Sequence, residues 1–189
     1  MNEKQTQILT ASIRLFAHEG VGVSTAKIAK EAQVSNGTLF NYYETKQALI
    51  DSVYFVIKEK MAADIINDLD LTLNMKTIFS TVWQRYSAWS WDHSLEFKVI
   101  NLLKSSQLLS EEVKTAGDNL WLTLHGIVQA GIKAKSLVAA PDLYLCEIAA
   151  GQLNATILYA RAHKFNKKKL ADLVDLGFSI YWHGICAKS

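Results

Sequence analysis

The segment STAKIAKEAQVSNGTLFNYY, residues 24–43, predicts two short helices joined by a tight turn. Ser24 or Thr25 can cap the first helix, residues 26–32, because their side-chain oxygens accept hydrogen bonds from the free amides of a helix start. The turn that follows contains the apolar Val34, whose side chain we expect between the two helices. Two short helices joined by about three residues describe a helix-turn-helix.

The second helix, residues 36–43, begins after Ser35 and combines an apolar side with a polar side. Leu39 and Tyr43 form the apolar stripe, with Phe40 expected to extend it. The opposite side carries Asn36, Gly37, Thr38, Asn41 and Tyr42. Amides and hydroxyls that packing leaves free are suited to base edges in the major groove and to phosphates. A glycine at the helix start also permits close approach of a second backbone.

The segments on both sides of this pair are predicted to be helical as well. A preceding helix ends at Gly20, and its inner face consists of Ile8, Ser12, Leu15 and Phe16. A longer helix begins at Glu44 or Thr45. Five further helices are predicted over residues 74–90, 94–108, 118–137, 142–164 and 168–187.

Since no segment alternates with the period of a strand, we expect an all-α fold of about nine helices. All five tryptophans lie after residue 80, which places a compositional boundary near residue 60. We therefore expect a helix-turn-helix domain over residues 1–60 and a larger helical domain over residues 61–189.

The chain has 189 residues and a net charge of only +2, from 20 basic and 18 acidic residues. A strongly cationic coat for nucleic acid is thereby excluded, so DNA binding would depend on individually placed contacts. Cys146 and Cys186 are too few for a disulfide framework and fit a cytoplasmic protein. The longest purely apolar run, Val53–Ile57, is far too short to span a membrane.

Motifs of catalysis and of metal binding are absent from the sequence. It contains no GxSxG, HExxH, GxxxxGKS/T or GxGxxG pattern, so we expect neither an enzyme nor a bound cofactor. Only His183 and Cys186 form a pair at helical spacing, and a zinc site needs three or four convergent ligands. We therefore expect no metal site.

Residues 8–53 resemble the amino-terminal domain of the TetR/AcrR family of bacterial transcriptional regulators. The matching residues are Ile8-Leu9, Leu15-Phe16, Gly20, Ser24-Thr25, Ile28-Ala29, Ala32, Val34-Ser35, Gly37 to Tyr43, Lys46 and Leu49. Two positions depart from the pattern. Phe40 stands where the family commonly has tyrosine, and Gln33 stands where it commonly has glycine. If that position needs a positive φ, the strain at Gln33 is about 1 kcal/mol.

The resemblance implies a homodimer that binds a palindromic operator in double-stranded DNA and is released by a small molecule. Ser24, Thr25 and Lys46 would then contact phosphate. Asn36, Gly37 and Thr38 would face base edges or the adjoining backbone. The positions that we assign to DNA contact are Ser24, Thr25, Lys27, Asn36, Gly37, Thr38, Asn41, Tyr42 and Lys46.

Aromatic residues of the second domain can line a cavity for a small apolar or aromatic effector. Trp83 and Tyr86 share a helical face, and Trp121 shares one with His125. His125 and Asn154 are the candidate polar groups of such a cavity, because ligand pockets are mostly apolar with a few polar groups. The ligand-binding set is Trp83, Tyr86, Trp121, His125 and Asn154. Plain core packing is the alternative for each of them.

The last two helices, residues 142–164 and 168–187, are expected to form the homodimer interface. The final one carries a wide apolar stripe, which we expect to face a symmetry mate. Its residues are Leu170, Leu173, Val174, Gly177, Phe178, Tyr181, Trp182 and Ile185. Burial inside one subunit is the alternative. The basic cluster of Arg161, Lys164 and Lys167 to Lys169 is interpreted as a solvated surface between these helices.

These expectations describe a cytoplasmic, ligand-responsive transcriptional regulator, most simply a repressor. Two alternatives stay open: a helical adaptor whose helix-turn-helix no longer binds DNA, and a DNA-binding protein that has no small-molecule effector.

Overall fold

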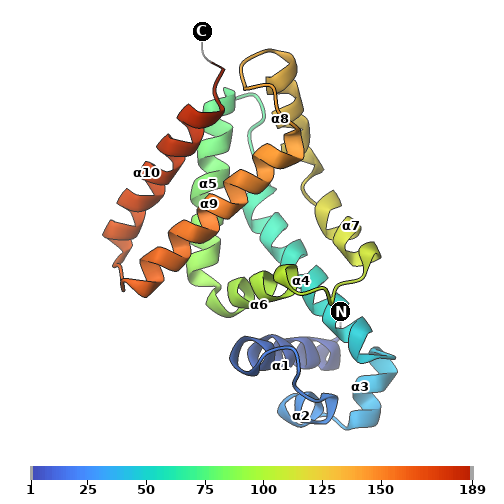
Figure 1. Cartoon of the computed structure of the whole chain (residues 1–189). Coiled ribbons are helices and arrows are strands. Elements are labelled where there is room, and N and C mark those ends of the chain that lie inside the picture. The colour runs from blue at the N-terminus through green and yellow to red at the C-terminus, as the bar shows by residue number, and fades with distance from the viewer. Residues whose placement is uncertain (1, 188–189) are drawn as a thin grey trace. The chain divides into compact units, whose positions relative to one another are not determined.

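The computed structural model describes residues 2–187, which form ten α-helices and no strand (Figure 1). The helices are α1 (Glu3–Glu19), α2 (Thr25–Glu31), α3 (Asn36–Tyr42), α4 (Lys46–Ile66), α5 (Met75–Asp92), α6 (Ser94–Ser105), α7 (Glu111–Asn119), α8 (Leu122–Lys133), α9 (Asp142–Ala162) and α10 (Lys167–Ile185). An isolated antiparallel bridge joins Leu137 to Cys186. The prediction of an all-α fold is confirmed.

The chain forms two compact units, and each contains two segments of sequence. Unit 1 comprises Met1–Lys60 and His93–Leu120, and unit 2 comprises Met61–Asp92 and Trp121–Ser189. The predicted boundary at residue 60 coincides with the end of the first segment of unit 1. However, α6 and α7 also belong to this unit, because α6 packs against α1 and buries Phe97 and Leu103. The functional division at residue 60 stays a prediction.

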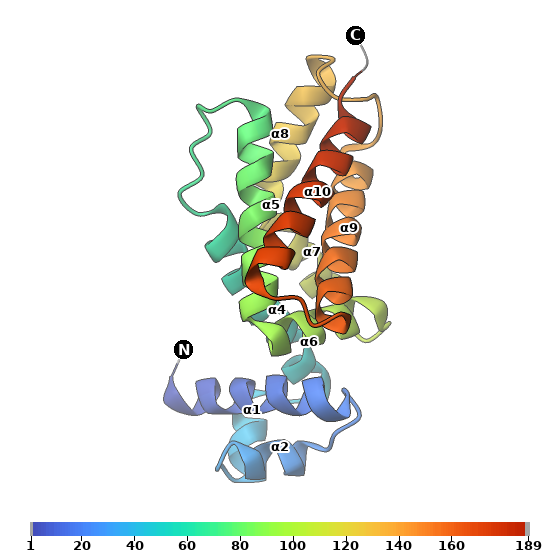
Figure 2. The same ribbon diagram turned by 90° about the vertical axis from the view of Figure 1, so that its left-hand side faces the viewer.

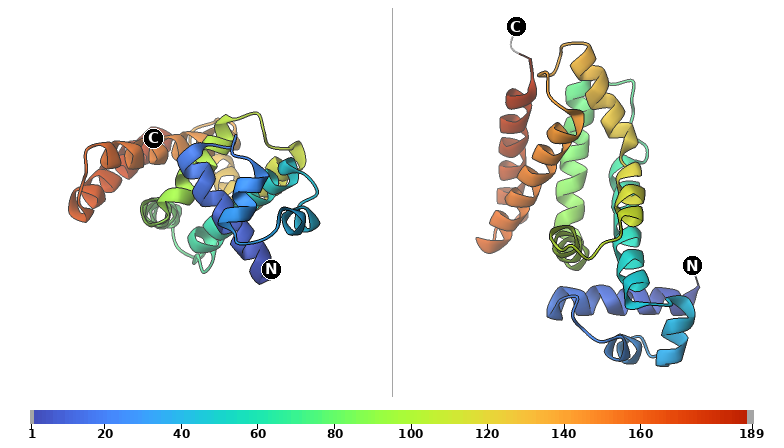
Figure 3. Two further views of the ribbon diagram at one scale, coloured as in Figure 1. Left: turned by 90° about the horizontal axis from the view of Figure 1, so that it is seen from below. Right: turned by 45° about the vertical axis from the view of Figure 1, so that its right-hand side comes forward.

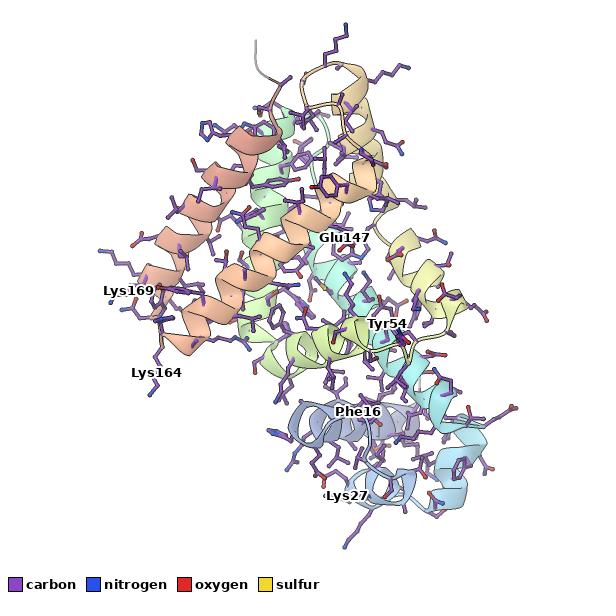
Figure 4. All side chains as sticks on the ribbon, in the orientation of Figure 1. Phe16, Lys27, Tyr54, Glu147, Lys164 and Lys169 are labelled. Atoms are coloured by element: carbon purple, nitrogen blue, oxygen red, sulfur yellow. The ribbon has the colours of Figure 1, made fainter. Side chains whose placement is uncertain are left out.

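The core of unit 1 is built from the apolar faces that the sequence indicates. Ile8 and Phe16 of α1 are buried, and Figure 4 shows Phe16 within this unit. Ser12 is accommodated in the same core because its hydroxyl donates to the carbonyl of Ile8 at 2.8 Å. Ile28 of α2 and Leu39 of α3 have no exposed surface. These short helices are therefore held by packing, since a seven-residue helix is not stable alone.

Three helices end in the same way although none of them has a glycine at the critical position. After α2, Gln33 takes a φ of 55°, and the amide of Val34 donates to the carbonyl of Ala29 at 3.0 Å. Lys135 after α8 and Lys164 after α9 have φ values of 56° and 52° and are followed by equivalent hydrogen bonds. This is the Schellman arrangement, which satisfies carbonyls at the helix end. The positive φ anticipated at Gln33 is confirmed.

Two predicted helices in the middle of the chain have wrong boundaries. The helix predicted over residues 94–108 ends at Ser105, and the helix predicted over residues 118–137 is α8, Leu122–Lys133. The separate helix α7 was not predicted. Its start has a cap, since the Ser110 hydroxyl oxygen accepts from the amide of Val113 at 3.3 Å.

Unit 2 contains the long helices α5, α9 and α10, which lie side by side in Figures 2 and 3. Trp83 of α5 stacks on Tyr181 of α10 with ring centroids 5.2 Å apart, and its indole N–H donates to the carbonyl of Val174 at 3.0 Å. Arg161 of α9 donates to the carbonyls of Ser90 and Trp91 at 2.6 and 3.1 Å. These carbonyls belong to the last turn of α5, where a cation is favourable.

Replacing Gln33 with glycine should stabilise the protein, because glycine adopts a positive φ without the steric cost of a Cβ. We expect Gln33→Gly to raise the free energy of unfolding by about 1 kcal/mol, measured by urea denaturation. Gln7→Gly, the same exchange at an exposed position inside α1, should lower it by about 1 kcal/mol. A loss of stability in Gln33→Gly would show that the side chain of Gln33 stabilises the turn.

Candidate nucleic-acid interface

Helices α2 and α3 pack against each other across the turn of residues 32–35, as the helix-turn-helix prediction requires. Ser24 caps α2 by accepting from the amide of Lys27 at 3.3 Å. Ser35 caps α3 by accepting from the amide of Thr38 at 3.0 Å. Both predicted caps are confirmed, and they determine where each helix begins. Val34 lies half-buried in the turn between them.

The outer face of α3 carries the polar residues that the sequence indicates. Asn36, Gly37 and Asn41 are exposed, whereas Leu39 is fully buried and Tyr43 is 6% exposed. The expectation that Phe40 extends the apolar stripe is wrong, since its side chain is 39% exposed. Successive residues of a helix are rotated by about 100°, so a helix anchored through Leu39 and Tyr43 turns the next position toward solvent.

Thr38 is half-buried and committed to the cap of its own helix. Its hydroxyl lies 2.8 Å from the Ser35 hydroxyl, and its amide donates to the same oxygen. The predicted contact of Thr38 with DNA would therefore have to share this hydroxyl with the cap.

Gly37 is not required by the packing of the protein. A Cβ built at this position would meet only the Ser35 hydroxyl oxygen, at 3.8 Å, which is an ordinary contact distance. Its φ lies outside the left-handed region. The fold therefore leaves room for a side chain here, and packing within the protein does not explain this glycine.

The two predicted lysine contacts differ in their surroundings. Lys27 donates to the carboxylate of Glu19 at 2.7 Å, so part of its charge is compensated within the protein. Lys46 is the first residue of α4, whose start is capped by the Thr45 hydroxyl at 3.0 Å from the amide of Ala48. A cation at a helix start is unfavourable unless an anion is close. Lys46 is thus the better candidate for a phosphate contact.

The sequence did not indicate the contact between Asn2 and Tyr42. The side-chain amide of Asn2 donates to the Tyr42 hydroxyl oxygen at 3.0 Å, across 40 residues of sequence. Asn2 also caps α1. A cap signal is visible in the sequence, since a capping asparagine is followed three residues later by glutamine. The contact with α3 is visible only in the tertiary structure.

Of the predicted ligand-binding residues, Tyr86 and Asn154 are brought together in unit 2. The Tyr86 hydroxyl donates to the Asn154 side-chain oxygen at 2.9 Å. Burial, and secondarily the charge of Glu147, raises the pKa of Tyr86 far above its usual value, so the phenol stays protonated. Trp83 is 2% exposed and packs as a core residue.

Trp121 precedes α8, and His125 lies one turn further along that helix; both are half-buried. His125 is close enough to Asp142 to contribute to lowering the pKa of that carboxyl, after the larger effect of its hydrogen bond with Gln129. The ligand-binding roles of all five residues stay predictions.

Within residues 2–187, no three histidine, cysteine or acidic side chains converge in a way that could hold a metal ion. Burial raises the pKa of the Cys146 thiol to about 11, assisted by the nearby charges of Asp142 and Glu147. Among the described helices, none combines the length and the apolar character that crossing a membrane requires.

The chain is similar in sequence to known bacterial regulatory proteins. Residues 8–53 match the sequence model of the bacterial regulatory proteins of the tetR family. The Fatty acid metabolism regulator protein of Bacillus subtilis (strain 168) is 25% identical over 162 residues, which cover 82% of this chain and 81% of that protein.

Two solved structures show the extent of the similarity in fold. A protein of Shewanella sp. PV-4, described as a tetR family transcription regulator, superimposes with a TM-score of 0.90 at 22% identity, covering 99% of this chain and 100% of its own. The transcriptional regulator FadR from Bacillus subtilis, in complex with stearoyl-CoA, gives a TM-score of 0.77 at 19% identity, covering 96% and 99%. The resemblance to the TetR family is confirmed, and the proteins of this family are transcription regulators.

Proposed function

We propose that this protein, which carries a TetR-family helix-turn-helix over residues 8–53 on a TetR-family fold, is a transcriptional repressor. It binds a palindromic operator as a homodimer and is released by a small molecule. The cytoplasm is its proposed location. In a dimer, the two copies of α3 would enter successive major grooves about 34–36 Å apart.

The observation that carries this proposal is the polar outer face of α3. Asn36 and Asn41 are exposed while Leu39 anchors the opposite side of the same helix. Asparagine side chains can donate to and accept from the edge of adenine in a bidentate manner. With a net charge of only +2, the affinity of the protein for a given site must depend on such placed contacts.

The proposed dimer is supported by exposed apolar side chains on α9 and α10. Seven large hydrophobic residues of these helices are between 38% and 59% exposed: Leu143, Tyr144, Ile148, Leu158, Tyr159, Leu176 and Ile180. Several large apolar side chains exposed on two helices that pack together favour an interaction site.

Four residues of the apolar stripe of α10, which the sequence places at the dimer interface, are instead buried inside the subunit. Leu170, Val174, Tyr181 and Ile185 are buried within unit 2, where α10 packs on α5 and α9. The expectation that these four residues face a symmetry mate is therefore wrong, since they belong to the core of their own subunit. Leu173, Phe178 and Trp182 of the same stripe are half-buried. Leu176 and Ile180, on a different face of α10, take the place of the four buried residues in the proposal.

The proposed effector is a small molecule with an apolar body. The FadR structure contains stearoyl-CoA, and the B. subtilis relative is named for fatty acid metabolism. A fatty acyl-CoA is therefore the first effector to test. Tyr86 and Asn154 are the proposed polar contacts, because each can exchange its mutual hydrogen bond for one to a ligand. A ligand releases DNA only if it binds the two conformations with different affinities.

The alternative of a helical adaptor has specific support. Phe40 lacks the hydroxyl common at its position in the family, and Glu19 compensates the charge of Lys27. Retention on random duplex DNA distinguishes the two functions, because phosphate contacts make DNA binding fall steeply with salt. An adaptor would show no such retention.

Substitutions at Lys46 and at the asparagines of α3 should have different effects on DNA recognition. We expect Lys46→Ala to weaken binding equally across sequences and to reduce the salt slope by about 1, since a phosphate contact carries no sequence information. Asn36→Ala or Asn41→Ala should change the base preference, measured by selection from a randomised duplex pool. An altered base preference in Lys46→Ala would contradict its assignment to phosphate.

Gly37→Ala should weaken DNA binding without lowering the stability of the protein. The added methyl group meets no close neighbour, and alanine favours a helix over glycine, so stability in urea should equal or exceed that of the wild type. Binding to the selected duplex should weaken about ten-fold or more, because the methyl group would obstruct the approach of DNA. Gly126→Ala on α8, which is equally unobstructed, is the matched control. Unchanged DNA affinity in Gly37→Ala would show that no duplex approaches this helix start.

Ile180→Glu should prevent dimer formation, because it places a charge on the proposed apolar interface. Sedimentation velocity at micromolar concentration should show a dimer for the wild type and a monomer for this variant. Leu122→Glu on α8 is the control, since Leu122 is 60% exposed and lies outside α9 and α10. A wild-type protein that sediments as a monomer would refute the dimer.

A further inference from the structure

Both polar atoms of the Asn2 side chain are hydrogen-bonded, which leaves that side chain little freedom. Its side-chain oxygen accepts from the amide of Gln5 at 2.9 Å, and its backbone amide donates to the Gln5 side-chain oxygen at 3.2 Å. This pair is the capping box of α1. The other polar atom of the side chain, the amide nitrogen, donates to the hydroxyl oxygen of Tyr42 at 3.0 Å.

The direction of the bond between Asn2 and Tyr42 is determined by chemistry. Because the Asn2 oxygen is occupied by the cap, its NH₂ group faces Tyr42, and an NH₂ group can only donate. The Tyr42 oxygen must therefore accept. Its own O–H proton points away from Asn2 and can be donated to another acceptor.

We propose that Asn2 is a positioning residue for DNA binding, which holds the Tyr42 hydroxyl so that its proton is donated to a phosphate oxygen of the duplex. This inference rests on the proposed function as a DNA-binding regulator. It assigns to the first turn of α1 a part in recognition that the sequence of the helix-turn-helix does not include.

The two other aromatic residues at the end of α3 cannot offer a hydroxyl to DNA as Tyr42 can. Phe40, on the exposed side, has no hydroxyl, and Tyr43 is buried with a pKa raised by that burial. Tyr42, which is half-buried at the last position of α3, thus holds the phenolic hydroxyl that a phosphate can reach. A hydroxyl that already accepts a hydrogen bond becomes a stronger donor, because linked hydrogen bonds polarise one another.

The bond between Asn2 and Tyr42 also lowers the entropic cost of DNA binding. A partly exposed tyrosine side chain has several accessible orientations, and immobilising it on binding is unfavourable. The bond to Asn2 selects one of these orientations before DNA arrives. The expected contribution is the cost of immobilising one side chain on binding, so loss of the bond should change affinity by about two- to ten-fold.

Asn2→Ser tests the proposal because it retains the cap and removes the amide donor. Serine and asparagine cap helices about equally well, and serine already caps α2, α3 and α7 in this protein. We expect Asn2→Ser to lower the free energy of unfolding by no more than about 1 kcal/mol, the value of one hydrogen bond, and to weaken binding to the selected duplex about two- to ten-fold. The salt slope should stay unchanged, since a neutral donor is lost, unlike in Lys46→Ala.

The Tyr42→Phe background shows whether Asn2 acts through the hydroxyl. If it does, Asn2→Ser should have no further effect on DNA affinity when combined with Tyr42→Phe. An equal loss in both backgrounds would overturn the proposal, because Asn2 would then act independently of Tyr42. Unchanged affinity of Asn2→Ser in the wild-type background would overturn it as well.

Asn2→Asp provides a second cap-preserving variant should Asn2→Ser lose stability. Its carboxylate can only accept, so the Tyr42 hydroxyl would donate its proton to residue 2 and no longer to DNA. In the Tyr42→Phe background, the loss of DNA affinity caused by Asn2→Asp should therefore be smaller. The loss that remains is the effect of the added negative charge. An equal loss of affinity in both backgrounds contradicts the proposal.

Failure of the proposed function gives a different result. If the wild-type protein binds no duplex at low salt, the protein is not a DNA-binding regulator, and a role of Asn2 in DNA binding is excluded as well.

Discussion

The burial of Leu39 and Tyr43 in unit 1 is the constraint on which the proposed recognition surface depends. A helix of seven residues gains too few internal hydrogen bonds to persist alone, so α3 exists because its apolar side is packed. With that side buried, the helical repeat turns Asn36, Gly37 and Asn41 outward. The angle between α2 and α3 is held by the turn at Gln33, whose positive φ redirects the chain and satisfies the carbonyl groups at the end of α2.

Local sequence signals predicted the helix starts of unit 1 because the atoms involved are a few residues apart. Ser24 and Ser35 cap α2 and α3 as expected, and Gly20 follows the end of α1 with a φ of 83°. Ser110, followed by Glu111 and Glu112, presents a similar signal for α7, and these residues could have revealed that helix.

Helix ends were harder to predict because the usual signal is missing. Lys135 adopts a positive φ where glycine is the common choice, so no glycine in the local sequence marks the end of α8. The hydrogen bonds of the Schellman arrangement stabilise this turn and offset the strain of the side chain.

The sequence by itself determined the helical fold, the position of the helix-turn-helix and the polar character of α3, because these follow from periodicity and from caps within one or two turns. The tertiary structure decided which of two apolar faces of α10 is buried, since both Val174 and Ile180 satisfy the helical pattern and only packing against α5 and α9 distinguishes them. It also decided that Asn2 meets Tyr42, because a hydrogen bond across 40 residues depends on how α1 and α3 pack.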